Sequence, residues 1–144
     1  MIYIIPNFLD PAADFIKDDP VRPHIPIEQR FEPNCQVIAL KNCEKIEALV
    51  CLRFCSGIPA SELELLSDKG LTPNVVVFYT IWSYVPGAGQ KLLRRSLAFI
   101  KDNAPDIQRF VTLSPATEMA RRFHIKNGAK LFRVNADTVN YEYD

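Results

Sequence analysis

The sequence predicts an α/β (α+β) fold with a central mixed β-sheet flanked by helices. Segments rich in apolar and β-branched residues, typical of strands, recur along the chain. In the second half of the chain, two segments with apolar residues at helical spacing lie between these strand-like segments. Strands and helices in this order pack as a sheet with helices on its faces. With 144 residues the chain has room for one core, so we expect a single domain over residues 1–144.

Composition and charge exclude several classes of protein. Hydrophobic residues make up 48% of the chain and charged residues 24%, which is typical of a folded globular protein. Lys plus Arg and Asp plus Glu both number 17, so no positive excess favours nucleic-acid binding. The apolar runs are far shorter than the roughly 20 residues that span a bilayer, and no signal-peptide pattern begins the chain. We expect a cytoplasmic protein without nucleic-acid or membrane partners, and the oligomeric state stays open.

The cysteine pattern favours reduced thiols over a metal site or disulfides. No CxxC pair occurs, and both histidines are distant from the cysteines in sequence. Nothing routes the chain to an oxidising compartment. We therefore expect no metal and no disulfide among Cys35, Cys43, Cys51 and Cys55, with Cys51 and Cys55 packed as reduced thiols on one face of the sheet.

Residues 1–34 are expected to form a Pro-rich segment that wraps around the sheet. Six of the 11 prolines lie here, and each proline removes a backbone donor and restricts the residue before it. We expect a strand at Ile2–Ile5 and a helix of one or two turns at Pro11–Lys17, with Asp10 as its N-cap. Residues 18–34 are expected to be a loop.

Residues 35–143 are expected to form the core. The stretch from Val75 to Tyr84 is apolar for nearly its whole length, which is typical of a central strand covered on both faces. The predicted strands are Gln36–Lys41, Ile46–Phe54, Val75–Tyr84, Gln108–Leu113, Lys130–Asn135 and Thr138–Tyr143. The predicted helices are a turn at Ser61–Leu66, a helix over Gln90–Asn103 and a further helix between the fourth and fifth strands.

That last helix has a strong predicted start at Ser114. We expect Ser114 to be its N-cap, Pro115 its first residue and Gly128 the residue that ends it. Ser114 and His124 would then lie about 15 Å apart along the helix axis, too far for a direct hydrogen bond. The buried stripe of this helix is expected at Met119, Ala120 and Phe123.

A glycine-containing turn joins the central strand to the helix that follows it. Such a turn presents free backbone N–H groups and the positive end of the helix dipole, which favour a phosphate or pyrophosphate. It is not a Walker loop, and Leu92 stands where the dinucleotide motif needs a third glycine. A tight turn without a ligand is the alternative. The candidate binding residues are Val85, Gly87, Ala88, Gly89, Gln90 and Lys91, with Arg94 and Arg95 close behind them.

The order of these motifs resembles the GNAT superfamily of acyl-CoA enzymes. In that family a glycine loop after the central strand binds the pyrophosphate of coenzyme A, which implies a coenzyme A thioester as substrate here. A later helix of the family ends in Leu-Tyr-x-x-x-Gly-Phe, and its tyrosine protonates the departing thiolate. His124 occupies the tyrosine position, which implies a proton donor with an ordinary pKa near 6.5. The matching residues here are Phe123, His124, Gly128 and Ala129, and the sequence departs from the family pattern at Tyr84.

A closer resemblance is to the catalytic domain of malonyl-CoA decarboxylase, a member of that superfamily. The serine and histidine of the family's motifs form its catalytic pair, and they carry over to Ser114 and His124. Only nine residues separate the two here, where the family has a long insertion. The motifs are Leu113-Ser114-Pro115, Phe123 to Ala129, Arg133 to Asp137 and Val139 to Tyr143.

Three functions stay open. Acetyl transfer from acetyl-CoA to an amine comes first, because most compact members of the superfamily catalyse it. Decarboxylation of malonyl-CoA by Ser114 and His124 is the alternative, and it suits a central strand that offers no carboxylate base. The third possibility is a sensor that binds acyl-CoA without turnover. The expected partners are a small acyl-CoA and an unknown acceptor.

Overall fold

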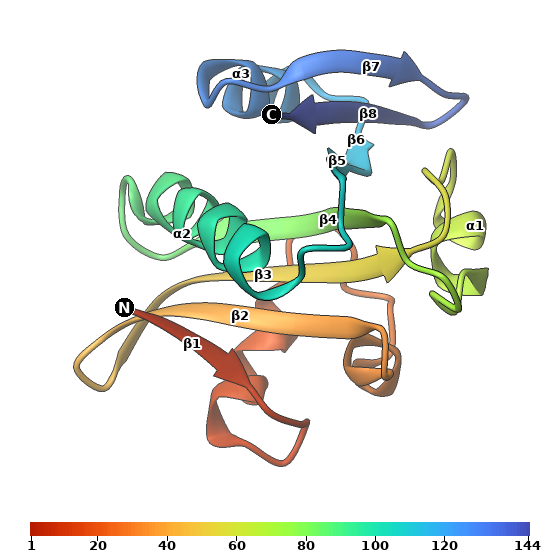
Figure 1. Ribbon diagram of the computed structural model, residues 1–144. Helices are drawn as coiled ribbons and strands as arrows, with labels where there is room; N and C mark the ends of the chain where they lie inside the picture. Colours follow the sequence, from red (N-terminus) through yellow and green to blue (C-terminus); the bar gives the residue numbers. More distant parts are fainter.

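One mixed sheet organises the computed structural model, which describes all 144 residues (Figure 1). The strands follow the order β1-β2-β3-β4-β5-β8-β6, and β7 pairs with the other edge of β8. The neighbours β4 and β5 are parallel, and the other pairs are antiparallel. The strands are β1 (Ile2–Ile5), β2 (Cys35–Asn42), β3 (Lys45–Cys55), β4 (Val75–Ser83), β5 (Arg109–Thr112), β6 (Ser114–Pro115), β7 (Lys130–Val134) and β8 (Thr138–Tyr143).

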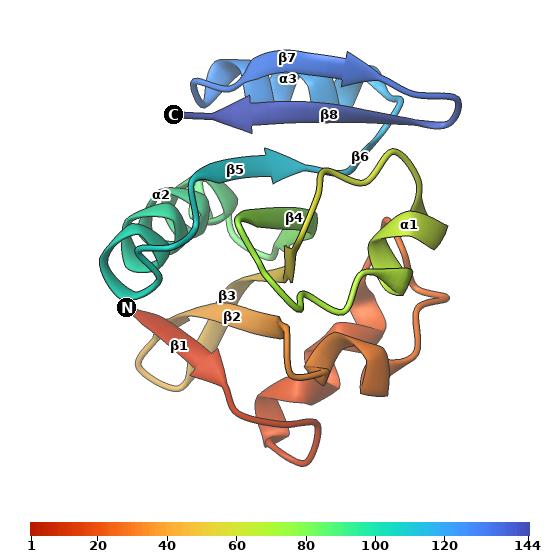
Figure 2. The same cartoon turned by 45° about the vertical axis from the view of Figure 1, so that its right-hand side comes forward.

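Helices and the N-terminal segment cover the two faces of this sheet (Figure 2). Alternate residues of β4 point into two apolar clusters. Val75 and Val77 face the cluster beneath the N-terminal segment, whereas Val76 and Phe78 face the cluster beneath α2. The fold class and the covered central strand are therefore as predicted. The helices are α1 (Glu62–Ser67), α2 (Ala88–Asn103) and α3 (Glu118–Lys126), with 3₁₀ helices η1 (Pro11–Asp18) and η2 (Ile27–Phe31).

The N-terminal segment is more ordered than its prolines suggest. Asp10 caps η1, and its Oδ1 accepts from the amide of Ala12 at 2.9 Å, as expected. The predicted loop over residues 18–34 contains η2, whose N-cap Pro26 has a φ of −58° that suits a helical start. None of the helices of the protein is both long and apolar enough to cross a membrane.

The predicted start of the last helix was wrong. Ser114 and Pro115 form β6 and pair with Val139 and Thr138 of β8. Proline is tolerated there because an edge strand of two residues does not require its N–H. The helix α3 begins at Glu118, and Gly128 follows its end with a φ of 98°, as predicted.

The apolar stripe of α3 is also not core. Met119 is 82% exposed, and His124 is the buried residue of this helix. Met119, Ala120 and Phe123 instead line a cavity between α3 and β4. Phe123 is partly buried and also packs against the cluster beneath α2, so part of this stripe contacts packed side chains as well as the cavity.

Candidate functional site

The sheet opens between β4 and β5. Their parallel pairing runs from Val75 with Arg109 to Phe78 with Thr112 and then stops. β4 continues to Ser83, whereas the chain after β5 enters β6 and pairs with β8. A cavity of about 520 Å³ lies where the strands part. This volume falls within the range of small-molecule sites.

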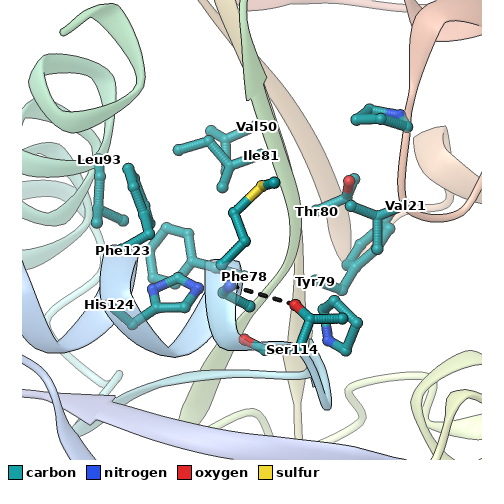
Figure 3. A pocket seen from close by; sticks show the side chains of 15 residues that line it. Val21, Val50, Phe78, Tyr79, Thr80, Ile81, Leu93, Ser114, Phe123 and His124 are labelled. Carbon is teal, nitrogen blue, oxygen red and sulfur yellow. Dashed lines mark hydrogen bonds between the residues drawn. The ribbon is translucent and has the colours of Figure 1, made fainter.

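The cavity is mostly apolar and carries no formal charge. It is lined by 15 residues, of which 9 are hydrophobic and none is Asp, Glu, Lys or Arg. Figure 3 shows Leu93 and Phe123 at one end, and Val21 and Thr80 at the other. Val21 belongs to the N-terminal segment, so that segment supplies part of the wall.

Most of the polar side chains around the cavity already have partners. Thr80 Oγ1 donates to Asp19 at 2.8 Å, and Thr117 Oγ1 caps the start of α3. Tyr79 packs into the core on the N-terminal side of the sheet and is 2% exposed. The remaining polar side chains of the lining are Ser114 and His124.

His124 is held among aromatic rings. It is 6% exposed, and its ring stacks on Tyr141 with a centroid distance of 5.3 Å. Its Nδ1 lies 2.6 Å from the hydroxyl of Tyr143. Burial lowers the pKa of His124 to about 4, so the imidazole is neutral near pH 7. The pKa near 6.5 that was expected for His124 was therefore wrong, because the sequence does not reveal this burial.

Tyr143 determines which nitrogen of His124 carries the proton. Burial raises the pKa of Tyr143, so its hydroxyl stays protonated. His124 Nδ1 is the acceptor within reach of that hydroxyl, which therefore donates to it. A neutral imidazole has one N–H, so hydrogen bonding assigns the proton to Nε2. Nε2 has no protein partner, and its N–H is free to donate to a ligand in the cavity.

Ser114 faces the same cavity from β6. Its side chain is buried, and its Oγ lies 2.8 Å from Thr112 Oγ1. In Figure 3 the side chains of Ser114 and His124 lie on the same side of the cavity. The structure thus brings both predicted catalytic residues to one site, because Ser114 precedes the helix instead of capping it.

The turn before α2 forms a second, cationic surface. Gly87 is the N-cap and has a φ of 82°, a left-handed conformation that favours glycine. A surface pocket of about 390 Å³ is lined by Gly87, Gln90 and Lys91 from the predicted set, and by Arg94 and Arg95. Val85, Ala88 and Gly89 belong to the same turn but lie outside this lining.

Phe123 links this turn to the main cavity. A Cβ added at Gly89 would lie 3.7 Å from the Phe123 ring, so the start of α2 packs against α3. Phe123 also lines the main cavity. The cationic surface and the main cavity therefore lie on either side of the contact between Phe123 and Gly89.

Metal ligands are not gathered anywhere in the protein. No group of three or more His, Cys, Asp or Glu side chains is placed to hold a metal ion, and all four cysteines are free. Sequence reasoning did not single out Thr112 or Tyr143, whose hydroxyls contact the two candidate residues. The alternation of Tyr141 and Tyr143 on β8 was the available signal, since it places both rings on one face.

No protein-family model matches the sequence, and no curated protein matches it either. Solved structures do match. The malonyl-CoA decarboxylase from Cupriavidus metallidurans superposes with a TM-score of 0.74 over 99% of this chain, at 16% identity. The GphF GNAT-like decarboxylase, in complex with isobutyryl-CoA, gives 0.75 over 99% of this chain and 98% of that protein, at 14% identity. A Bacillus subtilis acetyltransferase in complex with CoA gives 0.69 over 99% of this chain and 97% of that protein, at 11% identity.

This chain spans only part of the malonyl-CoA decarboxylases that it matches. It covers 60% of the Cupriavidus metallidurans protein and 35% of the one from Agrobacterium vitis, which is 21% identical over 85% of this chain. The two other structures match over nearly their whole length. At these identities the likeness concerns architecture. The chain therefore has the GNAT fold shared by acyl-CoA acetyltransferases and malonyl-CoA decarboxylases, as its glycine turn and C-terminal motifs predicted.

Proposed function

We propose that this protein decarboxylates a CoA thioester of the malonyl type, which carries a carboxylate β to the thioester carbonyl. One observation carries the proposal: an uncharged cavity in which Ser114 and His124 are the available polar side chains. The sequence alone favoured acetyl transfer to an amine. The cavity favours decarboxylation because this reaction requires hydrogen-bond donors but no carboxylate base.

The chemistry fits these two groups. The bond between the α carbon and the carboxylate breaks, carbon dioxide leaves, and the electron pair forms an enolate on the thioester oxygen. A proton from solvent then adds to the α carbon and gives the acetyl-type thioester. Donors aimed at the developing oxyanion lower the barrier. The N–H of His124 Nε2 is such a donor, and the Ser114 hydroxyl is the second candidate.

The neutrality of His124 supports this role. A neutral imidazole can donate to an enolate oxygen without being a strong acid, as in enzymes that polarise a carbonyl. The hydrogen bond from Tyr143 keeps the proton on Nε2. The apolar walls also leave the substrate carboxylate poorly solvated, and loss of carbon dioxide removes that charge.

The coenzyme would extend from this cavity toward α2. Free N–H groups at the start of α2 suit its pyrophosphate, and Lys91, Arg94 and Arg95 supply positive charge beside them. Phe123 packs against the turn and also lines the cavity, so the pantetheine arm would run beside its ring. The proposed substrate is therefore a CoA thioester, and the proposed reaction uses no metal.

Acyl transfer to an amine is the second candidate, and a neighbouring cavity favours it. This cavity of about 330 Å³ shares Val21 and Pro115 with the first, and its lining includes Glu62, His24 and Asp137. His24 Nε2 lies 2.7 Å from Glu62 Oε2. Such a pair is able to accept a proton from an amine that approaches from this side.

Direct product analysis tests the proposal. Purified protein is incubated with malonyl-CoA, and separately with acetyl-CoA and a panel of amines, and both products and carbon dioxide are measured by mass spectrometry. We expect carbon dioxide and acetyl-CoA from malonyl-CoA. His124→Gln and Ser114→Ala should each slow this reaction by about 10²–10³-fold, the usual effect of losing one oxyanion donor.

Glu118→Gln is the control, because Glu118 is an exposed residue of α3 outside the cavity. It should retain the rate of the wild type. Intact malonyl-CoA together with acetylated amines would contradict decarboxylation and support transfer. Tight binding of both thioesters without turnover would contradict both reactions and support a sensor that binds acyl-CoA.

A further inference from the structure

Thr112 lies behind Ser114, outside the lining of the cavity. It is the last residue of β5 and is 0% exposed. Its Oγ1 has two partners, the amide of Tyr141 at 3.0 Å and the hydroxyl of Ser114 at 2.8 Å. An amide N–H can only donate, so Thr112 Oγ1 accepts from Tyr141.

The direction of the bond between the two hydroxyls follows from hydrogen-bond satisfaction. One of them must donate to the other, and heavy-atom positions alone do not show which. If Ser114 donated, the proton of Thr112 would be buried without an acceptor, which proteins strongly avoid. If Thr112 donates, its hydroxyl is satisfied in both roles. The proton of Ser114 is then free to point into the cavity.

The backbone around Thr112 makes this arrangement rigid. Thr112 is paired with Phe78 of β4, and its carbonyl accepts from the side-chain amide of Asn140 at 2.7 Å. Asn140 is 0% exposed and also donates to the carbonyl of Pro59 at 3.0 Å. These contacts fix the backbone of Thr112, and the hydrogen bond from the Tyr141 amide holds its Oγ1 beside Ser114.

We propose that Thr112 is a positioning residue that makes Ser114 a hydrogen-bond donor toward the thioester oxygen of the ligand. Thr112 occupies one lone pair of the Ser114 oxygen, and the hydroxyl proton of Ser114 turns toward the cavity that His124 also lines. The thioester oxygen then receives two donors from two different elements, β6 and α3. This inference deepens the proposed function and rests on it for the identity of the ligand.

Kinetics with malonyl-CoA as substrate test the coupling between Thr112 and Ser114. The variants are Thr112→Val, Thr112→Ser, Ser114→Ala and the double variant. Thr112→Val keeps the shape of the side chain but removes the hydroxyl, and should lower kcat by about tenfold or more with little change in KM. Thr112→Ser should restore kcat. Thr112→Val in a Ser114→Ala background should cause no further loss of activity, because Thr112 acts only through Ser114.

Thermal unfolding separates this role from a structural one. Thr112→Val also deprives the Tyr141 amide of its acceptor and should lower Tm, with or without Ser114. In the Ser114→Ala background, Thr112→Val should still lower Tm but should no longer lower kcat. This combination supports a positioning role. Additive losses of kcat, or failure of Thr112→Ser to restore it, would overturn the inference.

A binding measurement makes the inference independent of the reaction. Acetyl-CoA has the thioester oxygen, whereas the thioether S-ethyl-CoA lacks it. Calorimetry should show that wild type prefers acetyl-CoA, and that Thr112→Val reduces this preference to the value of Ser114→Ala. An unchanged preference would overturn the role of Thr112. Wild type that shows the preference but leaves malonyl-CoA intact would contradict the proposed function and leave the role of Thr112 supported.

Discussion

At the scale of single residues, the environment of His124 matters more than its identity. The motif that contains it can be recognised from the sequence, and the structure places this residue in the lining of the cavity. Its ionisation could not be predicted, because the rings that bury it come from β8 as well as from α3. Tyr143 is 19 positions away along the chain.

The pH dependence of the reaction should report the lowered pKa of His124. If the neutral imidazole is the donor, the decarboxylation rate should be flat from about pH 5 to pH 8, because the pKa is about 4. The rate should change only as the pH approaches 4, where protonation of Nδ1 charges the ring and breaks the hydrogen bond from Tyr143. Initial rates in overlapping buffers measure this. A rate that changes with an inflection near pH 6.5 would show an ordinary, exposed histidine.

The same burial should appear in the pH dependence of stability. A histidine with a pKa below its unfolded value of 6.5 binds fewer protons when folded, so stability is full above pH 6.5 and declines toward pH 4. A shift of this size corresponds to a loss of roughly 3 kcal/mol. Urea unfolding at pH 7 and pH 4.5 should show a smaller decline for His124→Gln than for wild type. Equal declines would contradict the burial.

At the scale of elements, periodic segments were predicted well and the start of α3 was not. The helix α2 and the strands carry strong patterns, and their bounds differ from the predicted ones by only a few residues. Ser114-Pro115 and Thr117-Glu118 both resemble helix starts. The choice depends on pairing of Ser114 with Val139, a contact between distant positions that no local pattern contains.

The true cap of α3 can be identified by two alanine variants. Thr117 Oγ1 accepts from the amide of Ala120 at 3.2 Å, so Thr117→Ala should destabilise the protein by about 1 kcal/mol. Thr117→Ser should restore the cap. Chemical denaturation measures both. No loss of stability on Thr117→Ala, or a loss that Thr117→Ser does not restore, would contradict a cap at Thr117.

The turn before α2 should respond to charge rather than to size. A Cβ at Gly89 would meet the Phe123 ring at an ordinary contact distance, so Gly89→Ala should keep both fold and affinity for coenzyme A. Gly89→Glu adds a negative charge at the positive end of the helix and should weaken binding by about tenfold or more. Calorimetry with coenzyme A compares the two. Equal affinities for both variants would exclude a phosphate site at this turn.

At the scale of the whole molecule, buried charged residues hold the N-terminal segment on the sheet. We call the contacts of Asp19, Arg22 and Arg30 with each other and with β4 the lock. Arg30 and Asp19 form an ion pair of 2.7 Å whose side chains are 1% and 0% exposed. Asp19 also accepts from Thr80, and Arg22 donates to the carbonyl of Tyr79. The prolines predicted a wrapping segment here, but the partners on β4 lie about 60 positions away, so the lock itself could not be predicted.

Removal of one member of this pair should be costly. Asp19→Ala leaves Arg30 buried without its counter-charge and should lower the free energy of unfolding by about 3–5 kcal/mol. Glu118→Ala removes an exposed partner of Arg121 and should leave stability almost unchanged. Urea unfolding of both variants measures the contrast. A small effect of Asp19→Ala would mean that solvent reaches this cluster.

The position of this lock has a consequence for the lifetime of a complex. Pro20 and Val21, which close one side of the cavity, lie between the two anchored residues Asp19 and Arg22. This side of the cavity cannot widen unless the anchors release the segment. Weakening of the lock should therefore raise the dissociation rate of a bound thioester more than it changes the association rate. The most proline-rich part of the chain then acts on the dissociation rate, although it contains neither of the residues proposed to catalyse the reaction.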